Sequence, residues 1–108
     1  MDGLFDFFAD DREQFEKYKE WDARNPQFYP LFCQFTSQLL ERGWANIGVA
    51  LIFERIRWES MTTTVGEPFK LNNNYKSIYA RRFMRDFAQH DGCFRLRELK
   101  NKIDLEAA

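Results

Sequence analysis

The segment from Trp44 to Met61, WANIGVALIFERIRWESM, constrains the fold more than any other part of the chain. At about 100° per residue, its apolar side chains fall on two faces of a helix. One face holds Val49, Ile52, Phe53 and Ile56, and the other holds Ile47, Leu51 and Trp58. The narrow polar strips between them carry Glu54 with Arg57 and Arg55 with Glu59. Because two apolar faces need two covers, the sequence predicts a central helix packed between other helices.

Apolar spacing predicts three further helices. They run from Asp10 or Asp11 to about Arg24, from Pro26 or Pro30 to Arg42, and from Asn74 to about Gln89. In the last of these, Arg81, Arg82 and Arg85 lie opposite the apolar side and are expected to face solvent. Gly43 suits the C′ position after the second helix, and Asn46 suits the N-cap of the central one. The predicted fold is therefore a mainly α, single-domain bundle of about four helices over residues 1–108.

The size and composition agree with a folded domain. A chain of 108 residues can bury a core without disulfides, and 12 phenylalanines with 18% aromatics exclude a disordered chain. Cys33 and Cys93 make no disulfide framework and are expected to be reduced. The acidic start, MDGLFDFFADD, lacks the positive charge of a secretion signal, and no apolar run approaches roughly 20 residues. We therefore expect a soluble, cytoplasmic protein with no membrane partner.

Two segments are ambiguous. Thr62 to Val65 is β-branched throughout, and Gly66-Glu67 suits a tight turn, so residues 62–71 form either a short edge hairpin or a plain loop. The segment Cys93 to Lys102 is either a short helix or a strand, with Phe94, Leu96 and Leu99 partly buried. Residues 103–108 are expected to be a frayed tail.

Catalytic and metal-binding candidates are few. His90 is the sole histidine, and it lies in a helix-ending turn where it acts more often as a terminal cation than as a catalyst. Cys93 is close enough to form a Cys-His pair, but no orienting group is recognisable. One His-x₂-Cys unit with Asp86 or Asp91 falls short of the recurrent ligand spacing of zinc sites. We expect no catalytic residues, no metal and no cofactor.

The C-terminal part of the chain also contains a nuclease-like pattern. Glu98-Leu99-Lys100 has the E-x-K form, with Asp91 upstream. Metal-dependent nucleases hold such an Asp and Glu on adjacent strands so that both reach one Mg²⁺. Six residues between Asp91 and Glu98 leave too little chain for two strands and a turn. This spacing excludes the nuclease interpretation. A small enzyme is the third functional hypothesis, after nucleic-acid binding and protein interaction.

The charge distribution favours an anionic partner for the second half. Residues 1–24 hold eight acids and four bases, a net −4, whereas residues 55–100 hold ten bases and five acids, a net +5. The alternative is that the acidic start simply folds against the basic end and neutralises it.

The leading functional hypothesis is nucleic-acid binding through a basic, asparagine-rich helix face resembling a helix-turn-helix. The candidates are Arg55, Arg57, Lys70, Asn72, Asn73, Asn74, Lys76, Ser77, Arg81 and Arg85. Asn can form paired hydrogen bonds with adenine and Arg with guanine, while Lys binds phosphates. The connection of about a dozen residues and an isoelectric point of about 5.8 argue against it. Alternatively, these residues are turn, cap and solvated positions, or they form a protein-docking surface.

The N-terminal LFDFFADD supports a rival hypothesis. Its aromatic residues Phe5, Phe7 and Phe8 either close the core or belong to an arm over residues 1–9, which would bind a partner together with Asp6 and the neighbouring Asp10. Such an arm would dock on a basic partner surface, as in small inhibitory phage proteins, or exchange between two copies to make a homodimer.

The second half also carries a resemblance. The residues concerned are Trp58, Glu59, Gly66, Phe69, Lys70, Asn72, Asn73, Tyr79, Ala80 and Arg81. This pattern resembles a group of small uncharacterised bacterial and phage-associated proteins with no assigned activity. The resemblance implies a phage or mobile-element context and transfers no site residue. In sum, we expect a small non-catalytic binding protein.

Overall fold

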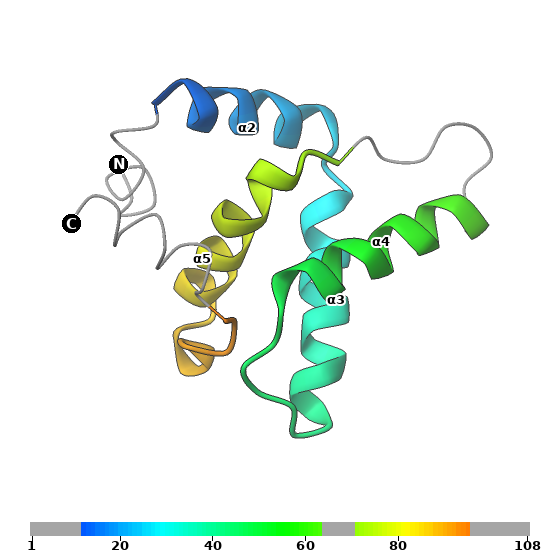
Figure 1. Ribbon diagram of the computed structural model, residues 1–108, viewed down its shortest axis with the longest axis vertical. Helices are drawn as coiled ribbons and strands as arrows, with labels where there is room; N and C mark the ends of the chain where they lie inside the picture. Colours follow the sequence, from blue (N-terminus) through cyan, green and yellow to red (C-terminus); the bar gives the residue numbers. More distant parts are fainter. Residues whose placement is uncertain (1–11, 64–70, 96–108) are drawn as a thin grey trace.

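The computed structural model describes residues 12–63 and 71–95 (Figure 1). Four α-helices lie in these ranges: α2 (Arg12–Arg24), α3 (Phe28–Glu41), α4 (Val49–Thr63) and α5 (Lys76–Asp86). Two short 3₁₀ turns, η2 (Asn73–Tyr75) and η3 (Ala88–His90), flank α5. The mainly α bundle is confirmed. None of the described helices combines the length and the apolar character that crossing a bilayer requires.

The centre of the bundle is aromatic. Tyr79 of α5 is fully buried, and its ring centroid lies 4.8 Å from that of Phe28 in α3 and 5.2 Å from that of Tyr18 in α2. Phe53 of α4 packs edge-on against Phe28 at 5.3 Å. Each helix therefore contributes a large ring to one shared core. In Figure 1, α2 lies across the top while α3 and α5 descend beneath it and α4 crosses α3.

The prediction that the Trp44–Met61 segment is covered on both sides is wrong. Only the face with Val49, Ile52, Phe53 and Ile56 is buried. Leu51 and Trp58, on the opposite face, are more than half exposed. Because the helix begins at Val49, Ile47 lies outside it, in the preceding connection. Helix α4 is thus a surface helix with one buried stripe.

The α3–α4 connection begins as predicted and then departs from the prediction. Pro30 lies in the first turn of α3, where its missing N–H costs little. Gly43 has φ +88°, and its N–H and that of Trp44 donate to Leu40 and Leu39, which is a Schellman ending. Asn46 is not the N-cap of α4, because it lies three residues before Val49 with φ +57°.

Residues 62–71 were expected to form either a short hairpin or a loop, and a strand beginning at Thr62 is wrong. Thr62 and Thr63 form the last turn of α4, and their hydroxyls donate to carbonyls of Trp58 and Glu59 within the helix. Residues 64–70 lie outside the described ranges. The next helix begins after an Asx turn in which Asn72 Oδ1 accepts the Asn74 N–H at 2.8 Å. It therefore starts slightly later than predicted, at Lys76, and ends at Asp86 rather than near Gln89.

The segment after η3 is tied to the connection before α4. The Ile47 N–H donates to Cys93 O at 2.7 Å, and the Arg95 N–H donates to Ile47 O at 2.7 Å, forming an isolated parallel bridge between Ile47 and Phe94. The buried ring of Phe94 packs against Phe32 of α3. Burial of Phe94 is confirmed, whereas Leu96 and Leu99 lie outside the described residues.

Candidate functional site

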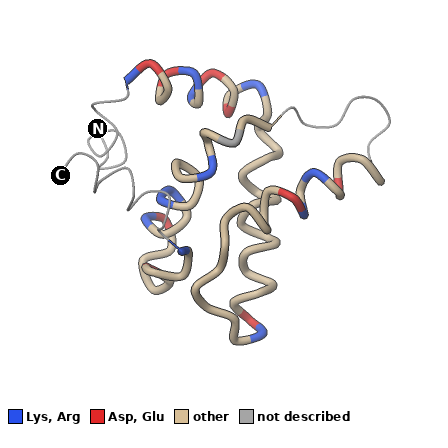
Figure 2. Tube along the Cα trace, in the orientation of Figure 1, with Lys and Arg blue, Asp and Glu red and all other residues tan. Residues whose placement is uncertain are grey.

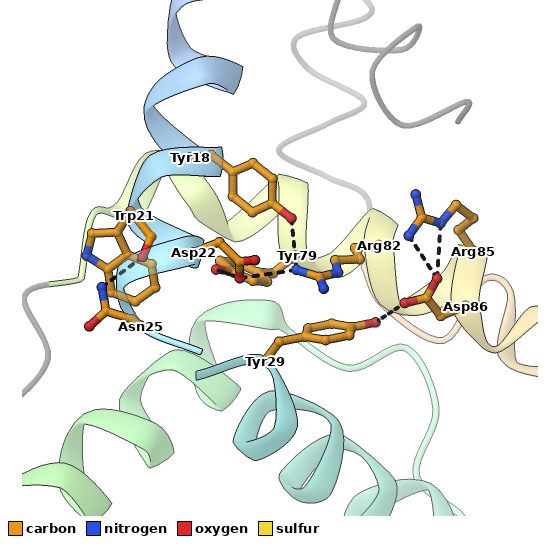
Figure 3. Close-up of polar contacts among 9 residues, drawn as sticks. All are labelled: Tyr18, Trp21, Asp22, Asn25, Tyr29, Tyr79, Arg82, Arg85 and Asp86. Atoms are coloured by element: carbon orange, nitrogen blue, oxygen red, sulfur yellow. Dashed lines mark hydrogen bonds and ion pairs between the residues drawn. The ribbon is translucent and has the colours of Figure 1, made fainter. Parts of the chain in front are cut away.

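The acidic and basic halves of the chain meet at a polar cluster between α2 and α5 (Figure 3). The Arg82 Nη1 donates to Asp22 Oδ1 at 3.1 Å and to the Tyr18 hydroxyl at 3.0 Å. The Tyr79 hydroxyl donates to the same Asp22 oxygen at 2.7 Å. Burial, and then the hydrogen bond to Asp22, raise the pKa of Tyr79 well above its ordinary value. This cluster pairs charges within the fold and offers no free catalytic group.

Arg82 was expected on the solvated side of the last helix, with Arg81 and Arg85. Its guanidinium instead lies 3.8 Å from the ring centroid of Tyr29, in addition to its bond to Asp22. The reason is that α2 and α3 both pack beside α5, so that α2 supplies the Asp22 carboxylate and α3 supplies the Tyr29 ring. The prediction that the arginines of this helix point outward is therefore wrong for Arg82.

A second polar cluster lies at the C-terminal end of α5. Tyr29 donates its hydroxyl hydrogen to Asp86 Oδ2 at 2.7 Å, and Arg85 Nε and Nη2 donate to Asp86 Oδ1 at 3.1 and 2.9 Å. Arg85 thus has a carboxylate in its own helix. Cys33 lies near Tyr29, and burial raises the pKa of its thiol, so the thiolate that nucleophilic catalysis needs is disfavoured.

The two α4 arginines of the predicted nucleic-acid face are ion-paired. Arg55 Nη1 lies 2.7 Å from Glu59 Oε1, and Arg57 Nη1 contacts Glu54 Oε2. The guanidinium of Arg55 also stacks at 4.3 Å from the Phe35 ring centroid. Both pairs join residues that share a polar strip in the sequence. The carboxylates neutralise the charge that a phosphate would need.

The remaining predicted residues lie around η2 and α5. Asn72 caps the η2 turn, Asn74 is exposed, and Lys76, Ser77 and Arg81 are half-buried. Burial lowers the pKa of Arg81, with Asp91 opposing that effect. Lys70 and the side chain of Asn73 lie outside the described positions. Figure 2 shows the basic positions of α4 and of α5 in separate parts of the molecule, with acidic positions beside those of α4.

The catalytic and metal candidates do not converge. Within residues 12–63 and 71–95, no group of three or more His, Cys, Asp or Glu side chains is placed to hold a metal ion. The His90 ring stacks on Phe83 with an interplanar angle of 19°. Burial raises the pKa of the Cys93 thiol to about 11, so it is a poor nucleophile near neutral pH. Glu98 and Lys100 of the rejected nuclease pattern lie outside the described ranges.

The exposed side of α4 is the feature that the sequence reasoning assigned to the core. Leu51, Trp58 and Met61 are 58%, 67% and 66% exposed. Together they form what we call the outer face of α4. The available signal was the spacing of Leu51 and Trp58, which lie two turns apart and about 150–170° from the centre of the stripe of Val49, Ile52, Phe53 and Ile56. Trp44, in the α3–α4 connection, is also 65% exposed.

The alternative surface, Phe5, Phe7, Phe8, Asp6 and Asp10, lies outside the described residues. Comparison of the chain with protein families, curated proteins and solved structures finds no match. The resemblance to phage-associated proteins therefore stays a prediction.

Proposed function

We propose that this chain is a non-catalytic protein-binding domain and that the outer face of α4 is its docking surface. The observation that carries the proposal is the exposure of Leu51, Trp58 and Met61 on one side of a single helix. Exposed apolar side chains that gather on one side of a helix, rather than lie scattered singly over the surface, are typical of interaction sites. Trp is also among the residues most enriched at the energetic centres of interfaces.

The spacing of these residues suits recognition of a helix. Leu51 and Trp58 are seven residues apart, and Met61 lies three residues further, so all three point to the same half of the helix surface. A partner groove or a partner helix can cover such a row in one contact. Glu54 and Arg55 lie between Leu51 and Trp58 and would form the polar rim.

Nucleic-acid binding, the leading hypothesis from the sequence, has less support than protein binding. A phosphate approaching Arg55 or Arg57 would have to displace Glu59 or Glu54. Arg85 is engaged by Asp86 in the same way. Most of the affinity of a protein for nucleic acid comes from lysines and arginines that neutralise phosphates. Arg55, Arg57 and Arg85 are already paired with carboxylates of this chain.

The proposal is tested by selecting peptides from a random library displayed on phage against the purified chain. We expect enriched peptides whose binding is lost with the double variant Leu51→Ser, Trp58→Ser. The double variant Lys17→Ser, Glu20→Ser on exposed positions of α2 is the matched control and should bind the peptides as the wild type does. Circular dichroism verifies that both variants fold.

Selections that yield no peptide dependent on Leu51 and Trp58 would overturn the proposal. A parallel titration uses mixed duplex and single-stranded oligonucleotides at low salt. Binding that falls steeply with added salt and weakens in the Arg81→Ala, Arg85→Ala variant would instead establish the nucleic-acid hypothesis. We expect no such binding.

A further inference from the structure

We infer that α2 is a strap that leaves the bundle as a unit while α3, α4 and α5 keep their common core. Its opening uncovers an aromatic face formed by Phe28 of α3, Tyr75 of η2 and Tyr79 of α5, on which the rings of α2 pack. The outer face of α4 takes no part in this movement.

The deepest part of the core forms without α2. Within the described part of the chain, the ten largest fully buried side chains all come from residues 28–94. Phe53 of α4 packs against Phe28 and Phe32 of α3. Phe32 packs in turn against Phe83 of α5. None of these contacts requires α2, so the other three helices keep a shared core when α2 leaves.

A single stripe of side chains holds α2 on the bundle. Phe15 and Tyr18 are buried, and Trp21 is partly buried. The Tyr18 ring lies 5.2 Å from that of Tyr79, and the Trp21 ring lies 5.0 Å from that of Phe28. Eight of the thirteen residues of α2 are charged, so most of the helix is suited to water on all sides. Because opening exposes less apolar surface than complete unfolding, it costs less free energy.

The polar contact between α2 and α5 is the latch of this strap (Figure 3). Asp22 accepts hydrogen bonds from Arg82 and from the Tyr79 hydroxyl, and the Tyr18 hydroxyl accepts one from Arg82. The side chains of Asp22 and Arg82 are partly exposed at the edge of the contact, so water reaches both when α2 leaves. Arg82 also keeps its stacking on Tyr29 of α3. Opening therefore leaves neither of these two charges buried without a partner.

The hinge is the connection from Asn25 to Gln27. Pro26 has no N–H and disfavours the helical conformation in Asn25, so α2 and α3 do not continue into one rigid helix. The Asn25 N–H donates to Asp22 O at 3.1 Å, and its Nδ2 donates to Trp21 O at 2.8 Å, which closes the end of α2. Both bonds lie on the α2 side of Pro26, so they move with the strap.

Native-state hydrogen exchange of the full chain, followed by NMR at residue resolution, tests this movement. We expect the amides of Tyr18, Lys19 and Glu20, in the middle of α2, to exchange through one common opening. That opening should be populated at least about tenfold more than the opening that exposes the amides of Phe35 in α3 and Phe53 in α4. Exchange in the middle of α2 that is as slow as at Phe35 would overturn the inference. So would protection that increases steadily along α2 until Glu20 matches Phe35, because only the end of the helix then frays.

The variant Ile56→Val separates opening of α2 from unfolding of the whole chain. Ile56 of α4 is fully buried, and it stays packed against the α3–α5 core when α2 is open. Loss of one methylene therefore destabilises the closed and the α2-open states equally. The amides of Phe35 and Phe53 should exchange about two- to tenfold faster, and the amide of Tyr18 should exchange as in the wild type. Equal acceleration of all three amides would show that α2 opens only with the whole fold and would overturn the inference.

The variant Asp22→Asn tests the latch. It weakens a contact that exists only in the closed state, so the Tyr18 amide should exchange at least about fivefold faster than in the wild type. Glu16→Gln is the matched control, because it removes an exposed pair with Lys19 inside α2, and it should change this rate by less than about twofold. Circular dichroism verifies that the variants fold. An exchange rate of the Tyr18 amide that Asp22→Asn leaves unchanged would overturn the role of Asp22 as the latch.

Discussion

Arg82 of α5 contacts Asp22 of α2 with Nη1 3.1 Å from Oδ1, although sixty positions separate them in the sequence. Their side chains are 23% and 27% exposed, so water screens this pair less than it screens the pairs on helix surfaces. Because the Tyr79 hydroxyl donates to the same carboxylate oxygen, Asp22 joins α2 to two residues of α5. The contact therefore fixes the position of the first described helix on the bundle.

We predict that Asp22→Asn lowers the free energy of unfolding by about 1–3 kcal/mol, because it removes a charge-assisted bond and leaves Arg82 half-buried without its carboxylate. Urea denaturation of the variant measures the change. Glu16→Gln is the matched control, since Glu16 pairs with Lys19 at 3.1 Å on the exposed side of α2. Its effect should stay within about 0.5 kcal/mol. Equal losses in the two variants would contradict a structural role for the Asp22 contact.

Stability should also fall at alkaline pH. Burial raises the pKa of Tyr18, Tyr29 and Tyr79 above the ordinary value of 10.0. Below pH 10 both states keep these phenols protonated, so they add no pH dependence. Above pH 10 the unfolded chain loses phenolic protons that the folded chain retains, so the free energy of unfolding falls as pH rises.

The test of this pH dependence is Tyr79→Phe. Between pH 9 and pH 11 the variant should lose about 1.4 kcal/mol less stability than the wild type, which is the contribution of one phenol that ionises only when unfolded. Urea denaturation at both pH values measures the two losses. Glu13→Gln, which changes no tyrosine, should keep the wild-type loss. An unchanged loss in Tyr79→Phe would show that Tyr79 ionises freely in the folded chain.

Much of the fold was predictable from apolar spacing, and the limits of that spacing explain the errors. Periodicity located four helices, and Gly43 marked the end of α3. Periodicity does not say how many neighbours a helix has, so Leu51 and Trp58 resembled core residues. In the structure Leu51 and Trp58 stay exposed, and α2 packs on α5 through Tyr18 and Tyr79.

The candidate site was less predictable, for a related reason. Counting bases along the sequence identifies cationic segments without identifying their partners. Arg55 and Glu59 are four residues apart, so their pairing could be anticipated. The pairing of Arg82 with Asp22 depends on how two distant helices pack, which no local pattern specifies. The charge asymmetry of the chain indicated only that acids of the first part could pair with bases of the second half, without identifying the residues.

A buried hydroxyl in α3 gives a stabilising prediction. Thr36 is fully buried, and within the described part of the chain its Oγ1 has no hydrogen-bond partner. Thr36→Val keeps the shape and removes the unsatisfied oxygen, so it should raise the free energy of unfolding by about 1 kcal/mol. Thr62→Val is the control, because Thr62 is exposed and its hydroxyl already bonds to helix carbonyls. It should not stabilise the chain, and a loss of stability in Thr36→Val would show that the hydroxyl has a partner.

The bridge between Ile47 and Phe94 predicts that the segment after η3 is part of the core and supports the start of α4. The Phe94 ring lies 5.5 Å from that of Phe32 and 5.8 Å from that of Phe83, and it is 2% exposed. Phe94→Ala should therefore lower the free energy of unfolding by about 3–4 kcal/mol, as large buried aromatics do when truncated. Urea denaturation measures this loss. Arg95→Ala, which removes only the exposed side-chain bond to Asn46 O, should cost about 1 kcal/mol or less.

Hydrogen exchange separates loss of packing from loss of the bridge itself. The Ile47 amide donates to Cys93 O, and the Arg95 amide donates to Ile47 O, so both should be protected in the wild type. In Phe94→Ala the ring no longer holds the segment against α3, and both amides should exchange faster than the amides of α3 itself. In Arg95→Ala the backbone bonds remain, so protection should persist. Fast exchange of the Ile47 amide in the wild type would mean that the bridge opens freely and that α4 begins without this support.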